Sequence, residues 1–276
     1  MKVHSLGMSN YSRVNEIACE RHSQRADIET SSDEYATRFS GPVGEYFLKV
    51  QEEITLSLLE PWQGCQVLDV GGGHGQLAVP LVRKGFRVTV AASDTACRTR
   101  LDKALPPGSF RFEVCDLLSL PFEDRSFDVV LAFRLLAHEE SWAAQISEMC
   151  RVAKHAVIAD YPDTRSFNLL YKSLFALKKR FERNTREFIT FRRRDVVAEF
   201  RASGFTAITL KPEFFAPMVV HRFHKRVPLS GSIERISSVL GFTRVFGSPV
   251  IVCARRQKPG ISSQCRVGIR RDAAGQ

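Results

Sequence analysis

The stretch Val67-Leu-Asp-Val-Gly-Gly-Gly-His-Gly-Gln-Leu77 decides the fold of this chain. An apolar run that includes an aspartate is followed by four glycines within five positions, and then by a segment with helical periodicity. A strand, a glycine-rich turn and a helix in this order begin a βαβ unit, because glycines let the backbone approach a ligand closely. From Val67 onward, apolar runs of strand length alternate with helical segments, and this predicts an α/β fold with a mostly parallel sheet.

The expected strands are near-continuous in hydrophobicity, which is typical of strands buried on both faces of a sheet. We expect seven of them, at 66–70, 87–92, 110–115, 127–133, 155–160, 206–214 and 249–254. Helices are expected at 75–84, 95–104, 140–152, 194–203 and 232–240. Gly204 and Gly241 end the last two of these helices.

Residues 31–258 are expected to form one domain, because 276 residues are too few for two domains of average size. Residues 1–30 and 259–276 lack periodicity and predict flexible tails. Two insertions are expected within the domain, a basic amphipathic one at 165–194 and a linker at 215–230.

The insertion at 165–194 combines an apolar face with a basic one. The apolar face consists of Phe167, Leu170, Tyr171, Leu174, Phe175 and Phe181, and the basic face of Lys172, Lys179 and Arg183. We interpret it as a helical cap over the sheet edge or the active site. A peripheral contact with a membrane or another anionic surface is the alternative.

Charge is divided unevenly along the chain. Residues 1–164 carry 17 basic and 23 acidic side chains, whereas residues 165–276 carry 23 and 7. A basic second half favours an anionic partner or a solvated basic face, and net charge alone does not decide between them. We expect a cytoplasmic protein with reduced thiols, because there is no apolar segment of membrane-spanning length, no secretory signal and no C-x-x-C among the seven cysteines.

The glycine loop raises the question of which cofactor it serves. Read from Gly73, it satisfies the dinucleotide fingerprint G-x-G-x-x-G/A, but Gln76-Leu77 excludes a P-loop. Asp69 would place a negative charge near a pyrophosphate and oppose its binding. A cationic ligand suits this acid better than a nicotinamide dinucleotide does.

A series of motifs resembles the class I S-adenosylmethionine-dependent methyltransferases. These motifs are Asp69-x-Gly71-x-Gly73-x-Gly75, then Asp116, and then L-P-F-x-D-x-S-F-D-V-V at 120–130. The similarity is to the small-molecule branch that includes the ubiquinone and menaquinone C-methyltransferases, and it covers residues 35–160 best. It implies a Rossmann-like, doubly wound, seven-stranded sheet with an antiparallel last strand, and S-adenosylmethionine as cofactor.

The resemblance also implies roles for individual residues. Asp69 and Gly71 would lie by the methionine amino group, and Gly73 and Gly75 would let the backbone approach the cofactor. The remaining residues would line the adenine (Cys115, Asp116, Leu117) and the methionine end (Phe133, Arg134), while Tyr35 would close over the cofactor.

The chain departs from the family pattern at the end of the second strand. An acid that binds both ribose hydroxyls is expected there, and this chain has Ala92. Either a bulge brings Asp94 to the ribose, or Ser93 makes a weaker contact. The alternative for Asp94 is a helix cap without a ligand role.

These motifs favour methyl transfer to an oxygen or carbon atom of a small apolar molecule that resembles a lipid, quinone or polyketide. If the acceptor must lose a proton, His138, His221 and Tyr161 are candidate bases, and His224 is a further one. Two alternative functions remain open: a regulatory protein that binds the cofactor without catalysis, and an RNA-associated methyltransferase. The sequence disfavours nucleic acid, because Ala132-Phe-Arg-Leu135 replaces the [N/D]-P-P-[Y/F] element of amino-group methylases.

Overall fold

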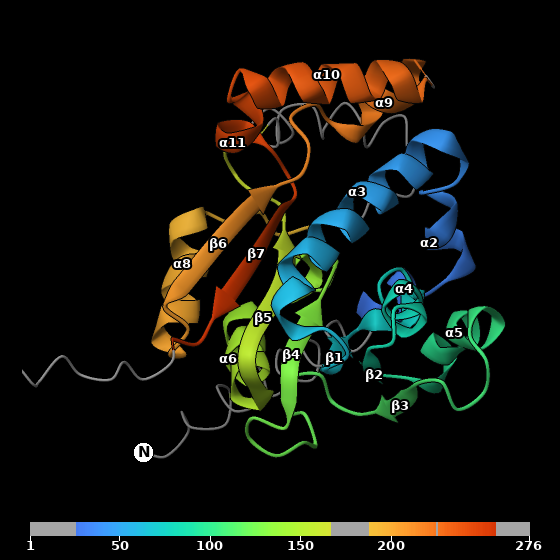
Figure 1. Cartoon of the computed structure of the whole chain (residues 1–276), viewed down its shortest axis with the longest axis vertical. Helices are drawn as coiled ribbons and strands as arrows, with labels where there is room; N and C mark the ends of the chain where they lie inside the picture. The colour runs from blue at the N-terminus through green and yellow to red at the C-terminus, as the bar shows by residue number, and fades with distance from the viewer. Residues whose placement is uncertain (1–25, 167–187, 225, 258–276) are drawn as a thin grey trace, which may run out of the picture.

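The computed structural model describes residues 26–166, 188–224 and 226–257 of the chain (Figure 1). Seven strands form one sheet in the order β3-β2-β1-β4-β5-β7-β6. Their bounds are β1 Gln66–Val70, β2 Arg87–Ala92, β3 Arg111–Val114, β4 Phe127–Ala132, β5 Ala153–Tyr161, β6 Ala207–Pro212 and β7 Val250–Arg255. Strand β7 pairs antiparallel with β5 and β6, whereas the other strand pairs are parallel. The predicted doubly wound α/β sheet with an antiparallel last strand is therefore confirmed.

Helices cover both faces of the sheet, and each face has its own core. Side chains of α3 (Gly41–Leu59), α4 (Ala78–Arg83) and α5 (Thr99–Ala104) pack in one core, and those of α6 (Trp142–Val152) and α8 (Arg193–Ala202) in the other. The long α3 crosses the front of the sheet in Figure 1, with α6 and α8 behind it. Strands with both faces covered require the continuous apolar runs that the sequence shows.

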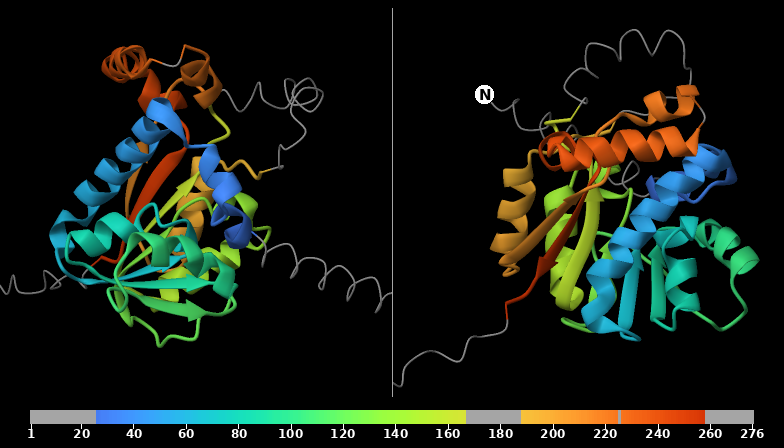
Figure 2. Two further views of the ribbon diagram at one scale, coloured as in Figure 1. Left: turned by 90° about the vertical axis from the view of Figure 1, so that its right-hand side faces the viewer. Right: turned by 45° about the horizontal axis from the view of Figure 1, so that its top comes forward.

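The remaining elements lie at the carboxyl ends of the strands or connect the main layers. Helices α9 (Met218–His224), α10 (Val227–Val239) and α11 (Phe242–Phe246) form a layer beyond the ends of β5 and β6 (Figure 2). The shorter elements are α2 (Asp33–Thr37) and the 3-10 turns η1 (Glu60–Trp62), η2 (Gly72–His74), η3 (Thr95–Arg98) and η4 (Leu136–His138).

Two helices begin at other residues than the sequence predicted, and the local sequence explains each difference. The helix expected at 75–84 begins at Ala78, because the glycine loop forms the turn η2 and Gly75 is left-handed. The helix expected at 232–240 begins at Val227, where Pro228 is suited to a first turn that needs no backbone donor. The predicted linker at 215–230 consequently contains α9 and the start of α10.

The predicted N-terminal tail ends earlier than residue 30. Residues 26–30 are helical, and the side chains of Ala26, Asp27 and Thr30 are buried. Residues 167–187 of the predicted insertion lie outside the described residues, as do 1–25 and the predicted tail at 259–276. In the described part of the chain, no helix combines the length and apolarity needed to cross a membrane.

Candidate functional site

The glycine loop after β1 wraps closely over an acid. Gly71 and Gly75 have positive φ angles of 71° and 75°, which favour glycine. The backbone N–H of Gly71 donates to the Ala91 carbonyl at 2.8 Å and so ties the loop to β2. A Cβ atom built on Gly72 would lie 2.2 Å from the carboxyl carbon of Asp69. Larger residues at this point would therefore displace the acid beneath the turn.

Asp69 is the most unusual group at this end of the sheet. Its side chain is fully buried, and neither carboxylate oxygen has a hydrogen-bond partner in the structure. Burial raises the pKa of this carboxyl to about 7. An ionised carboxylate is costly to bury without a partner, and a cation beside it would offset this cost. Asp69 thus fits a positively charged ligand.

At the end of β2, Asp94 is the helix cap that the sequence left open as the alternative to a ribose contact. The β2 register with β1 and β3 is continuous up to Ala92, so no bulge carries Asp94 inward. The exposed Asp94 side chain instead accepts from the Ala96 N–H at 2.7 Å and caps η3. Ser93 faces a different acid, because its N–H and its hydroxyl donate to Asp27 at 2.7 and 2.5 Å.

The residues after β3 lie beside the end of β2. The N–H of Cys115 donates to the Ala92 carbonyl at 2.9 Å, and burial raises the pKa of this half-buried thiol to about 11. The Asp116 carboxylate is exposed and accepts from the Leu118 N–H at 2.9 Å. Leu117 is buried, and its carbonyl accepts from Gln145 at 3.1 Å. This segment therefore lies beside the carboxyl end of β2.

The end of β4 brings Arg134 against the N-terminal helices. Phe133 is buried in the core, whereas Arg134 has a φ of 58°, which is uncommon for a residue with a side chain. Its guanidinium carbon lies 3.9 Å from the Phe39 ring centre and 5.9 Å from that of Tyr35. Tyr35 and Arg134, which were predicted separately, are thus brought together.

A buried polar network that the sequence did not predict supports Arg134. The Asp160 carboxylate accepts from the Arg134 N–H at 2.6 Å and from the Gln51 amide at 3.3 Å. Gln51 also donates to Glu213 at 3.0 Å. Burial raises the pKa of both Asp160 and Glu213. The position of Asp160 at the end of an apolar run was the one sequence signal for this network.

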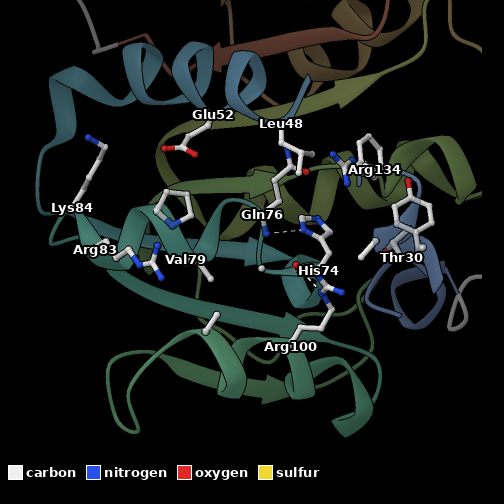
Figure 3. A pocket seen from close by; sticks show the side chains of 16 residues that line it. Thr30, Leu48, Glu52, His74, Gln76, Val79, Arg83, Lys84, Arg100 and Arg134 are labelled. Carbon is white, nitrogen blue, oxygen red and sulfur yellow. Dashed lines mark hydrogen bonds between the residues drawn. The ribbon is translucent and has the colours of Figure 1, made fainter. Parts of the chain in front are cut away.

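A cavity of about 680 Å³ lies between the N-terminal helices and the glycine loop (Figure 3). Its apolar lining includes Tyr35, Phe39, Leu48, Val79 and Pro80, and its basic lining includes Arg83, Lys84, Arg100 and Arg134. His74 also faces it, and its Nδ1 accepts from the Gln76 N–H at 3.0 Å. Burial lowers the pKa of His74 to about 3, so its ring is neutral near pH 7.

The three candidate bases differ in exposure. His138 lies on η4 after β4 and is partly exposed. Tyr161 and His221 are fully buried, and burial raises the pKa of Tyr161. The His221 Nε2 lies 2.9 Å from Glu234, and its ring meets Phe47 edge-on. The side chain of His224 lies outside what the structure describes.

The fold therefore gathers some of the predicted site residues and separates others. Asp69, Gly71, Gly73, Ser93 and Cys115 meet at the carboxyl ends of β1, β2 and β3. The Asp94 and Asp116 carboxylates are exposed and bind nearby backbone N–H groups. Asp27 is an additional acid that the sequence did not single out, because it lay within the predicted tail.

Comparisons with known proteins agree with this geometry. Residues 68–158 match the model of a methyltransferase domain. An O-methyltransferase, cnsE, of Penicillium expansum is 34% identical over 110 residues, which cover 37% of this chain and 40% of that protein. A ubiquinone biosynthesis O-methyltransferase of Paramagnetospirillum magneticum is 35% identical over 86 residues, which cover 30% of this chain and 33% of that protein. The chain thus spans less than half the length of these two relatives.

Solved structures show the same fold at low sequence identity. The magnesium protoporphyrin IX methyltransferase of Synechocystis, with bound SAH, has a TM-score of 0.56 at 16% identity, covering 86% of this chain and all of that one. An S-adenosylmethionine-dependent methyltransferase of Mesorhizobium loti has a TM-score of 0.54 at 14% identity, covering 75% of this chain and 98% of that one.

The strand order and the glycine loop over a buried acid define a Rossmann-like methyltransferase domain. Residues 68–158 carry a methyltransferase domain, and the fold around them is that of solved S-adenosylmethionine-dependent methyltransferases. The site fits that cofactor, because Asp69 is a buried carboxylate with no hydrogen-bond partner among the described residues.

Proposed function

We propose that the chain transfers a methyl group from S-adenosylmethionine to an oxygen or carbon atom of a small apolar molecule. The observation that carries this proposal is the buried carboxylate of Asp69 beneath the glycine loop, which has no hydrogen-bond partner in the part of the chain that the structure describes. S-adenosylmethionine supplies a methyl group already activated by a sulfonium leaving group, so the protein must chiefly provide position and charge.

The residues around the loop would each bind a different part of the cofactor. Asp69 would hold the cationic amino acid part, and Gly71, Gly73 and Gly75 would form the loop above it. Cys115, Asp116 and Leu117 would flank the adenine. Tyr35 and Arg134, which lie close to each other on the cavity wall, would close the methionine end.

The acceptor class rests on the relatives and on the cavity. The names of two relatives include a quinone. One is the ubiquinone biosynthesis O-methyltransferase described above, and the other is a 2-phytyl-1,4-naphtoquinone methyltransferase of Nostoc punctiforme. The latter is 27% identical over 144 residues, covering 47% of this chain and 63% of that protein. The apolar and basic lining of the cavity favours an apolar acceptor that carries an acidic hydroxyl.

We propose His138 as the base that removes the acceptor's proton. It is partly exposed, whereas Tyr161 and His221 are fully buried. His138→Asn should lower kcat by roughly 10²-fold while leaving cofactor affinity unchanged, because general bases contribute effects of about this size. His155, a partly exposed histidine near the start of β5, provides the matched control as His155→Asn. Equal activity of the two variants would contradict this role.

The experiment that tests the proposed function follows the transferred methyl group. The protein is incubated with S-adenosylmethionine labelled in its methyl group and with a panel of quinols, phenols and polyketide-type enols. Mass spectrometry should detect S-adenosylhomocysteine and a labelled acceptor, and Asp69→Asn should reduce both. Labelling of RNA in place of the small molecules, or cofactor binding without turnover of any acceptor, would contradict the proposal.

A further inference from the structure

The end of β2 lacks its own acid, yet a carboxylate from elsewhere in the chain lies there. Ala92 ends the strand, and the exposed Asp94 is engaged as a helix cap. Asp27, which is 66 positions before Ser93 in the sequence, has a fully buried side chain at this point. The short helix at 26–30 therefore places a carboxyl group at the end of β2.

Three donors fix the orientation of the Asp27 carboxylate. The Ser93 hydroxyl donates to Oδ1 at 2.5 Å, and the Ser93 N–H donates to Oδ2 at 2.7 Å. The Cys97 thiol lies 3.6 Å from Oδ2 and adds a weak contact. A carboxylate can accept about four hydrogen bonds in total, so Asp27 retains acceptor capacity for further donors.

The same segment lies against the cofactor loop. A Cβ atom on Gly71 would lie 3.5 Å from the Cβ of Asp27, and one on Gly73 would lie 2.4 Å from the Ser31 hydroxyl oxygen. The Asp27 charge is also the last of the causes that raise the pKa of Cys115, after burial and the charges of Glu113 and Asp116. Asp27 is thus located between the glycine loop and the segment after β3.

We propose that Asp27 accepts hydrogen bonds from the ribose hydroxyls of the cofactor, in place of the acid that is absent at Ala92. The proposal rests on S-adenosylmethionine being the cofactor, as in the proposed function. Two neighbouring hydroxyls are suitable donors to one carboxylate, and hydrogen bonds to a charged acceptor are stronger than neutral ones. On this account, a segment before the sheet completes the cofactor site.

Isothermal titration calorimetry with S-adenosylhomocysteine and its 2′,3′-dideoxy analogue tests the proposal. Asp27→Asn should weaken binding of S-adenosylhomocysteine by roughly 10- to 100-fold, as expected for loss of hydrogen bonds to a charged group. The same variant should weaken binding of the dideoxy analogue far less, because that ligand has no ribose hydroxyls. Glu29→Gln, a change of a partly exposed acid on the same helix, is the matched control and should leave both affinities within about twofold of wild type.

Several results would overturn the proposal. One is an equal loss of affinity for both ligands in Asp27→Asn, and another is tighter binding, which would mean that Asp27 competes with the ribose. A loss of affinity for S-adenosylhomocysteine but not for the dideoxy analogue in Asp94→Asn, without such a loss in Asp27→Asn, would also contradict it. Ser93→Ala, which removes one group that orients Asp27, provides a milder variant and should show a smaller but ribose-specific loss. If wild type binds neither ligand, the proposed function fails too, whereas wild-type binding without dependence on Asp27 contradicts this inference alone.

Discussion

Three carboxyl groups with raised pKa values lie near the carboxyl ends of β1, β5 and β6. Asp69, Asp160 and Glu213 are all buried there, and burial is the largest cause of the shift in each case. Asp160 and Glu213 share Gln51 as a donor, whereas none of the described residues donates to Asp69. This contrast at the residue scale separates carboxylates that the fold itself satisfies from the one that a ligand would satisfy.

Replacement of Asp69 should reveal the cost of its burial. The folded-state pKa of about 7 exceeds the usual value of 3.8. At a pH between these two values, the folded protein keeps a proton on Asp69 that the unfolded chain has lost. The free energy of unfolding of wild type should therefore fall as pH rises, by about 2 to 3 kcal/mol between roughly pH 5 and pH 8. Asp69→Asn lacks this contribution, and urea denaturation at both pH values should show it gaining stability relative to wild type at the higher pH. Parallel changes in the two proteins would contradict the assignment.

Cofactor binding should release a proton from the same carboxyl group. A cation beside Asp69 favours the ionised form and lowers its pKa. At roughly pH 6.5, titration with S-adenosylhomocysteine in buffers of different ionisation enthalpy should detect a fraction of one proton released per site. Asp69→Asn should bind more weakly and release none, and an unchanged release in this variant would assign the proton to another group.

At the scale of elements, α8 is attached to the rest of the fold by a buried ion pair. The Arg193 guanidinium bonds to the fully buried Asp163 just after β5, and its other nitrogens donate to the Arg244 and Val245 carbonyls of α11. One side chain therefore connects α8, the end of β5 and α11. This junction fixes the helices that follow β6 against the sheet.

Arg193→Ala should destabilise the protein by about 3 to 5 kcal/mol, because it removes a charged partner of the fully buried Asp163. Arg194→Ala is the matched control, since that exposed pair with Asp195 should contribute less than about 1 kcal/mol. Urea denaturation of both variants at neutral pH measures the difference. Similar stabilities for the two would show that the Asp163 contact is not a stabilising junction.

At the scale of the whole molecule, the sequence predicted the sheet better than the complete site. Strands β1, β2, β4 and β7 are buried on both faces, so their apolar runs alone indicate them. The glycine loop and Asp69 were also predicted, because they are adjacent in sequence. The Gln51 and Asp160 contact and the Asp27 and Ser93 contact join residues 109 and 66 positions apart, and only tertiary packing brings them together.

The central claim is that this fold holds S-adenosylmethionine at the glycine loop above Asp69. Calorimetric titration of the wild-type chain with S-adenosylmethionine, S-adenosylhomocysteine and NADH tests it directly. We predict that both sulfur compounds bind in the micromolar range or more tightly and that NADH does not. Micromolar binding of NADH, with no binding of either sulfur compound, would contradict the account.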